Sequence, residues 1–174
     1  MSEWKITTLG QEVDLLTGNP FKSVQYTDNE GDVLLLRGDN IGQGLLRWEN
    51  AKRWSTEKTE GIEDYFLQED DVVLAMDRPW IEAGLKFAYL SQDDLPCLLV
   101  QRVSRLRAKP KLNQTFLRYV IQGYEFTQYI IKTQTGTAVP HISGTQIKDF
   151  EFLIPPLTTL RTISSGDDAV ITKG

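Results

Sequence analysis

The sequence contains very few of the residues that build metal centres, disulfides and nucleophilic sites. Its 174 residues include one cysteine, Cys97, and one histidine, His141. A single cysteine excludes an intramolecular disulfide and a cysteine-based metal cluster. Cys97 and His141 could form a nucleophile and its base, but the more ordinary interpretation of Cys97 is a small buried residue beside Pro96. These counts favour a protein without a covalent catalytic centre.

Several longer sequence features are also missing. There is no phosphate-binding Walker loop and no Gly-x-Gly-x-x-Gly dinucleotide fingerprint. The longest apolar runs, at 71–76 and 98–100, are far shorter than a membrane span. Residues 1–4 have neither the basic nor the apolar part of an export signal. We therefore expect a cytoplasmic protein that binds no cofactor and no membrane.

Acidic and basic residues are unevenly distributed along the chain. The whole sequence has a net charge of −5, yet residues 78–118 contain eight basic and three acidic residues, a local charge of +5. Residues 1–77 carry −9 and residues 119–174 carry −1. Such segregation can present a positive face to a polyanion while the rest of the surface stays acidic. The alternative is an ordinary solvated strand-and-loop surface.

Apolar periodicity and turn signals predict an α+β fold, strand-rich in the N-terminal two-thirds and helical in the C-terminal portion. Asn113 is a good N-cap for a helix from about Gln114, and Gly123 is expected to break or bend the helical region. In the expected strand over 97–107, charged and apolar side chains fall on both faces, so the exposed face is not defined. Strands are expected at 32–37, 71–76, 85–90, 97–107 and 150–154.

The basic segment carries side chains suited to nucleic acids. The guanidinium of arginine donates two parallel hydrogen bonds to phosphate or guanine, and asparagine and glutamine amides can read adenine. Arg78 follows a predicted strand and precedes Pro79-Trp80, so we expect it on a stiff loop that leaves the sheet. Trp80 itself is more typical of a core or strand-pairing aromatic than of a stacking platform. DNA contact is predicted for Arg78, Lys86, Arg102, Arg105, Arg107 and His141, with Asn40 and Gln134 as weaker candidates.

A series of short landmarks follows in order over residues 4–157. They are Trp4, Leu9-Gly10, Gly18, Leu36-Arg37, Asn40-Ile41, Gly44, and the segments 71–78, 84–86, 101–107, 116–117, 136–143 and 152–157. Together they resemble the target recognition domain in the specificity subunit of type I restriction-modification enzymes. The resemblance covers nearly the whole chain, and it implies target-recognition-domain architecture.

The resemblance also implies what the protein does. It implies a non-catalytic reader of double-stranded DNA, in a family where two such domains each read half of a split target. The methylation subunits and the restriction subunit are the implied protein partners, and they carry methyl transfer and cleavage. S-adenosylmethionine is then a ligand of the methylation subunit, and no cofactor is expected on this chain.

Two departures and two rival functions accompany this interpretation. With one recognition domain, expected over 4–157, the chain can read at most half of a split site. Residues 158–174 are expected to be the start of a truncated spacer helix or a disordered tail.

One rival function is a protein-interaction module whose basic strand meets an acidic partner. The other is a metal-dependent nuclease that uses Asp77, Glu82 and Lys86.

Overall fold

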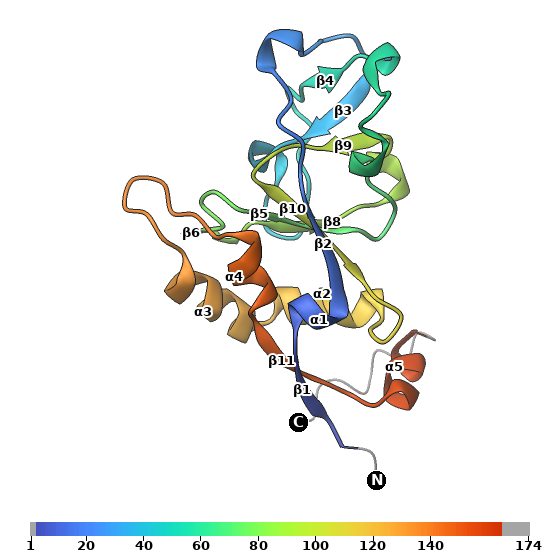
Figure 1. Ribbon diagram of the computed structural model, residues 1–174. Helices are drawn as coiled ribbons and strands as arrows, with labels where there is room; N and C mark the ends of the chain where they lie inside the picture. The colour runs from blue at the N-terminus through green and yellow to red at the C-terminus, as the bar shows by residue number, and fades with distance from the viewer. Residues whose placement is uncertain (1–2, 165–174) are drawn as a thin grey trace.

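The computed structural model describes residues 3–164, and it confirms the α+β class with a strand-rich N-terminal part and C-terminal helices (Figure 1). The N-terminal elements are β1 (Lys5–Thr8), α1 (Leu9–Glu12), β2 (Val13–Thr17), β3 (Val33–Leu36), β4 (Arg53–Trp54), β5 (Val72–Ala75), β6 (Trp80–Ile81), β7 (Gly84–Leu85), β8 (Phe87–Tyr89), β9 (Cys97–Leu99) and β10 (Val103–Ala108). The C-terminal elements are α2 (Gln114–Gln122), α3 (Tyr124–Thr133), α4 (Gly144–Lys148), β11 (Glu151–Ile154) and α5 (Leu157–Ser164).

A four-stranded antiparallel sheet, in the order β2-β10-β5-β8, forms the centre of the fold. Residues 103–106 of β10 are all buried, because apolar clusters cover both faces of the sheet. Over these residues, neither face of β10 is exposed to solvent. The single strand expected over 97–107 is two strands, β9 and β10, because the chain turns at residues 100–102 and passes from one sheet to another.

A second sheet, in the order β4-β3-β9, lies on the side of the central sheet away from the helices (Figure 1). β3 and β9 run parallel, and Leu34, Leu35 and Leu36 pair with Cys97, Leu98 and Leu99. Gly18 lies where the chain leaves β2, and a Cβ there would come within 2.0 Å of the carbonyl oxygen of Val100. The crossing of these two segments therefore requires glycine.

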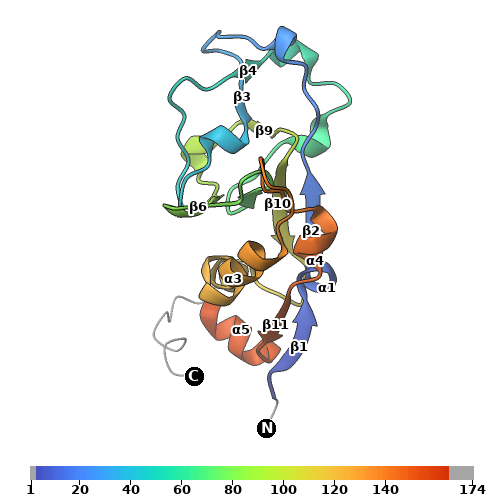
Figure 2. The same cartoon turned by 90° about the vertical axis from the view of Figure 1, so that its left-hand side faces the viewer.

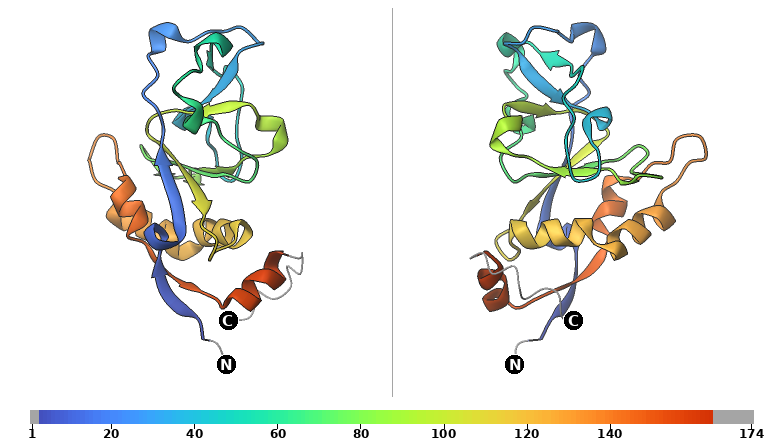
Figure 3. Two further views of the ribbon diagram at one scale, coloured as in Figure 1. Left: turned by 45° about the vertical axis from the view of Figure 1, so that its right-hand side comes forward. Right: turned by 180° about the vertical axis from the view of Figure 1, so that it is seen from behind.

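Helices α2 and α3 cover the opposite face of the central sheet (Figure 3). Local signals define their ends as expected: the Asn113 side chain accepts a hydrogen bond from the backbone N–H of Phe116, and Gly123 ends α2 and begins α3. Their apolar faces bury Leu117, Ile121 and other side chains in the largest core cluster. Packing of this amphipathic face, more than intrinsic propensity, stabilises such short helices.

The entering and leaving strands of the domain lie side by side, since β1 pairs antiparallel with β11 from Lys5↔Ile154 to Thr8↔Glu151 (Figure 1). Helix α5 follows β11, and its Leu160 and Ile163 are buried in the core. Of the segment 158–174, expected as the start of a spacer helix or a tail, residues 158–164 belong to α5 and residues 165–174 lie outside the described residues. Among the helices that the structure describes, none has the length and apolarity needed to cross a bilayer.

Two projections leave the body of the molecule on the same side: the β6–β7 hairpin and the loop between α3 and α4 (Figures 1 and 2). Backbone hydrogen bonds join the loop to the chain just after β5, where the N–H of Arg78 donates to the carbonyl of Pro140. The same side thus carries segments that are far apart in the sequence.

Candidate nucleic-acid interface

Backbone hydrogen bonds at the end of β5 join this strand to two other segments of the chain. Met76 donates its N–H to the carbonyl of Arg102 at 2.9 Å and accepts one from Ile142 at 2.9 Å. Thr135 and His141 exchange backbone hydrogen bonds of 2.8 and 2.7 Å, which close the loop between α3 and α4 into a hairpin-like arm. Three chain segments therefore meet at residues 76–78.

Asp77 lies at the centre of this cluster and contacts two of the predicted DNA-binding residues. Its Oδ2 accepts a hydrogen bond from Nη1 of Arg102 at 2.7 Å, and its Oδ1 lies 2.6 Å from Nδ1 of His141. Burial by itself raises the pKa of Asp77, but the hydrogen bonds from His141 and Arg102 outweigh it and the pKa is lowered. The carboxylate is therefore ionised at neutral pH and binds both side chains.

Arg78 and Lys86 add positive charge beside Asp77. Arg78 is exposed, and it forms no ion pair among the described residues. Lys86 is half-buried between β7 and β8, and its backbone N–H donates to the carbonyl of Pro79 at 2.7 Å. Burial lowers the pKa of Lys86, with Asp39 opposing that shift and the nearby Arg78 adding to it. Cationic side chains outnumber carboxylates here, as a surface for a polyanion requires.

Backbone strain is concentrated in the same cluster. Four non-glycine residues in the described part of the chain have positive φ, and two of them are Arg78 (φ 46°) and Arg102 (φ 65°). A side chain rarely adopts this left-handed conformation, and such strain gathers at functional sites. Arg78 follows the end of β5, and Arg102 precedes β10, the strand that pairs with β5. The structure thus brings together Arg78, Lys86, Arg102 and His141.

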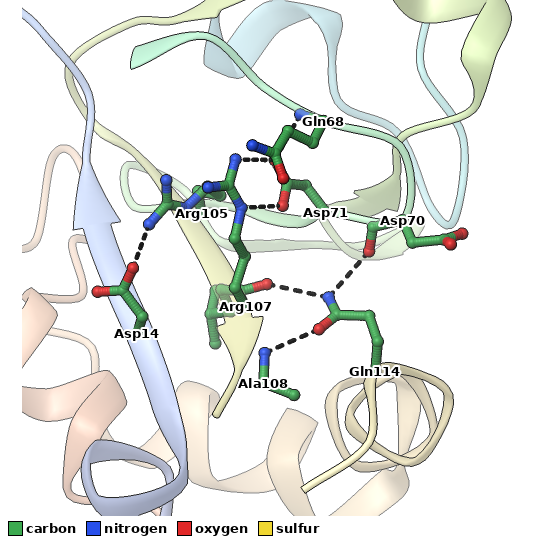
Figure 4. A network of polar contacts seen from close by, with 9 residues as sticks. Asp14, Gln68, Asp70, Asp71, Arg105, Arg107, Ala108 and Gln114 are labelled. Atoms are coloured by element: carbon green, nitrogen blue, oxygen red, sulfur yellow. Dashed lines mark hydrogen bonds and ion pairs between the residues drawn. The ribbon is translucent and has the colours of Figure 1, made fainter. Parts of the chain in front are cut away.

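Arg105 and Arg107 lie elsewhere, inside the sheet network shown in Figure 4. Arg105 is 4% exposed, and its Nη2 lies 2.6 Å from Oδ2 of Asp14 on β2. Arg107 donates from Nε and Nη2 to the two oxygens of Asp71 at 2.5 and 2.9 Å, and the Asp71 side chain is only 2% exposed. Both arginines therefore bind carboxylates within the fold, away from the cluster around Asp77, and DNA contact by either of them stays a prediction.

The two weaker amide candidates also lie outside the cluster of charges. Asn40 is 3% exposed, and its amide accepts from the N–H of Arg37 and donates to the carbonyl of Arg47. It therefore holds the glycine-rich loop together, and base contact by Asn40 stays a prediction. Gln134 caps α3 at the base of the arm, and its buried Oε1 has no hydrogen-bond partner among the described residues.

Sequence reasoning did not predict the projecting hairpin on this surface. Trp80 pairs with Leu85 across the β6–β7 hairpin, in line with the strand pairing expected for it, and Trp80 and Ile81 are 37% and 38% exposed. The hairpin turns at Glu82-Ala83, and Gly84, which begins β7, has a positive φ of 128°, so this glycine is the local sequence signal for the hairpin. The nuclease hypothesis gains no support from this arrangement, because both oxygens of Asp77 bind other side chains and the described residues contain no group of three possible metal ligands.

Comparison with known proteins identifies the family. The family model described as the type I restriction modification DNA specificity domain matches residues 1–172. The chain belongs to this family. It is 35% identical over 171 residues to the type I restriction enzyme EcoAI specificity subunit of Escherichia coli, covering 97% of this chain and 28% of that subunit.

A second relative is the type I restriction enzyme MjaVIII specificity subunit of Methanocaldococcus jannaschii. It is 30% identical over 156 residues, covering 89% of this chain and 36% of that subunit. The chain thus spans about a third of the length of these curated relatives.

Solved structures share the fold. The HsdS subunit from Thermoanaerobacter tengcongensis matches with a TM-score of 0.60 at 17% identity, over 93% of this chain and 36% of that one. A chain from a type I R-M system, solved to explain its complex assembly and conformational transition, gives a TM-score of 0.65 at 17% identity, with the same coverage. At this identity the likeness establishes the fold, and it confirms the target-recognition-domain architecture expected from the sequence.

Proposed function

We propose that this chain recognises double-stranded DNA and reads one half of a bipartite target for a type I restriction-modification complex. The observation that carries the proposal is the cluster of Arg78, Lys86, Arg102 and His141, which four separate segments bring to one exposed side of a family member. Membership of the chain in the type I restriction modification DNA specificity domain family supports it.

The chemistry of the cluster suits a duplex in two ways. Arg78 and Lys86 have no carboxylate bonded to them in the described structure, so they can neutralise phosphates. Arg102 and His141 are held in fixed positions by Asp77, as side chains that read base edges must be. The β6–β7 hairpin and the arm between α3 and α4 project from the body of the molecule on the same side (Figure 2).

The proposal extends to the partners. The methylation and restriction subunits of the same system are the proposed protein partners, and they supply methyl transfer and cleavage while this chain supplies specificity. Residues 4–157 form the proposed recognition domain, and the residues from 158 onward are the proposed start of a spacer. The site of action of such a complex is the cytoplasm, where the chromosome and incoming DNA are accessible.

A charge-removal experiment tests DNA binding. Arg78→Ala is expected to weaken binding of the 174-residue chain to a duplex and to reduce the slope of log K against log salt by about 1, since one phosphate contact is lost. Arg161→Ala removes an exposed arginine on α5, remote from the cluster, and serves as the matched control (Figure 1). Equal affinities and slopes for wild type and both variants would contradict the proposal. Retention of an acidic protein in place of DNA would favour the interaction-module rival.

A further inference from the structure

We propose that Asp77 is a positioning residue that turns Arg102 and His141 into one donor–acceptor pair, and that this pair reads a G·C base pair. The inference rests on the proposed function, because it assumes that the cluster faces DNA. It adds an acidic residue to a surface that is otherwise defined by positive charge. It also names the base pair that the surface selects.

Asp77 determines which nitrogen of the His141 imidazole ring carries the proton. Asp77 is ionised, so its Oδ1 can only accept a hydrogen bond, and the proton of the 2.6 Å contact belongs to Nδ1 of His141. In the neutral ring the other nitrogen, Nε2, then carries a lone pair. The His141 side chain is 41% exposed, so this acceptor is open to a ligand.

Asp77 also holds the guanidinium group of Arg102. Asp77 engages Nη1 of Arg102 through Oδ2, and the Arg102 side chain is 67% exposed. The remaining N–H groups of the planar fork are therefore free to donate outward. One carboxylate thus fixes two side chains from two different segments, with an open donor on Arg102 and an open acceptor on His141.

This arrangement matches one base pair in the major groove. Guanine presents two acceptors, O6 and N7, and its partner cytosine presents an amino donor at N4. Arginine is the most common reader of guanine, and an acceptor beside it can bind the cytosine amino group. An A·T pair offers its amino donor and acceptors in a different order, and a fixed pair of side chains discriminates against it. Removal of Asp77 releases both side chains and removes the constraint on the ring.

The first test needs no DNA. His141 is the single histidine of the chain, so the ring nitrogen signals in a 15N NMR spectrum have one origin. At pH 8.5, where imidazole rings are neutral, the wild type is expected to carry its proton on Nδ1 and Asp77→Ala to shift toward the Nε2–H form. A wild-type ring protonated on Nε2, or an unchanged tautomer in Asp77→Ala, would overturn the positioning role.

The second test measures base selection by the 174-residue chain. A randomised duplex library is selected at pH 8.5 and low salt with wild type, Asp77→Ala, Arg102→Lys and Asp14→Ala. Asp14→Ala is the matched control, since it also removes a carboxylate from an arginine ion pair, but away from the cluster. Wild type and Asp14→Ala are expected to require a G·C pair at one position. Asp77→Ala and Arg102→Lys should lose that preference by about tenfold or more.

Different outcomes would overturn the G·C inference and the proposed DNA recognition. A wild-type site without a required G·C pair, or an undiminished preference in Asp77→Ala, overturns this inference while leaving DNA recognition intact. A wild-type chain that selects no sequence and retains no duplex overturns the proposed function. In that case the ring tautomer still decides whether Asp77 positions His141.

Discussion

Removal of the Arg107 side chain is expected to destabilise the fold, although the sequence placed this residue on a DNA-binding face. In Arg107→Ala, Asp71 loses two hydrogen bonds of 2.5 and 2.9 Å and keeps the one from the N–H of Gln68. Its carboxylate stays in a position only 2% exposed to solvent. Leaving a buried charge without its partner costs about 3–5 kcal/mol. The Arg107 side chain is 28% exposed, so water can enter after truncation, and we expect the lower end, about 3 kcal/mol.

Urea unfolding monitored by tryptophan fluorescence measures this loss. With a slope of about 2 kcal/mol per molar urea, the midpoint should fall by about 1.5 M. The control Arg161→Ala, on an exposed helix position, should stay within about 0.5 kcal/mol of wild type. The double variant Asp71→Leu/Arg107→Met should recover part of the loss, because it removes both charges together. An Arg107→Ala chain with wild-type stability and weakened DNA binding would refute this reasoning.

Three further predictions concern other parts of the chain. Burial raises the pKa of the Cys97 thiol, so a thiol reagent such as DTNB should label Cys97 only after unfolding, and rapid labelling of the folded chain would contradict its burial. Gly18→Ala should destabilise by about 3 kcal/mol because its Cβ would overlap the backbone of Val100, whereas Gly31→Ala, which meets only a distant side-chain oxygen, should be near neutral in the same urea assay. The pKa of Asp77 is lowered below its ordinary value of 3.8, so its stabilising effect is present above that pH and is lost as the pH falls through the folded pKa. The difference in unfolding free energy between wild type and Asp77→Asn should therefore shrink from pH 6 toward pH 2.5, and a constant difference would count against the ion pairs.

The sequence predicted the elements whose signals are local. The N-cap at Asn113 and the break at Gly123 are confirmed, because a cap and a helix end depend on residues within a few positions. The buried strand expected at 71–76 is confirmed as Val72–Ala75, since a continuous apolar run has few other placements. The division of 97–107 into two strands was missed, because periodicity cannot show where a chain changes sheets.

Side-chain partners far apart in the sequence could not be predicted. Arg105 and Arg107 bind carboxylates 91 and 36 positions away, and a charged residue is placed on the surface by default when its partner is unknown. The contact of Asp77 with His141 spans 64 positions. The sequence could therefore identify Arg78, Arg102 and His141 as candidates, but not the carboxylate that joins two of them.

The pairing of β1 with β11 has a consequence for how such a unit is exchanged between proteins. Because the entering and leaving strands are hydrogen-bonded neighbours, the whole unit has its two junctions at one place (Figure 1). It can be spliced into a longer polypeptide as a cassette, with little demand on the geometry of the host. The charged cluster belongs to other elements, so a replacement cassette can bring a different charged surface while the junction stays the same.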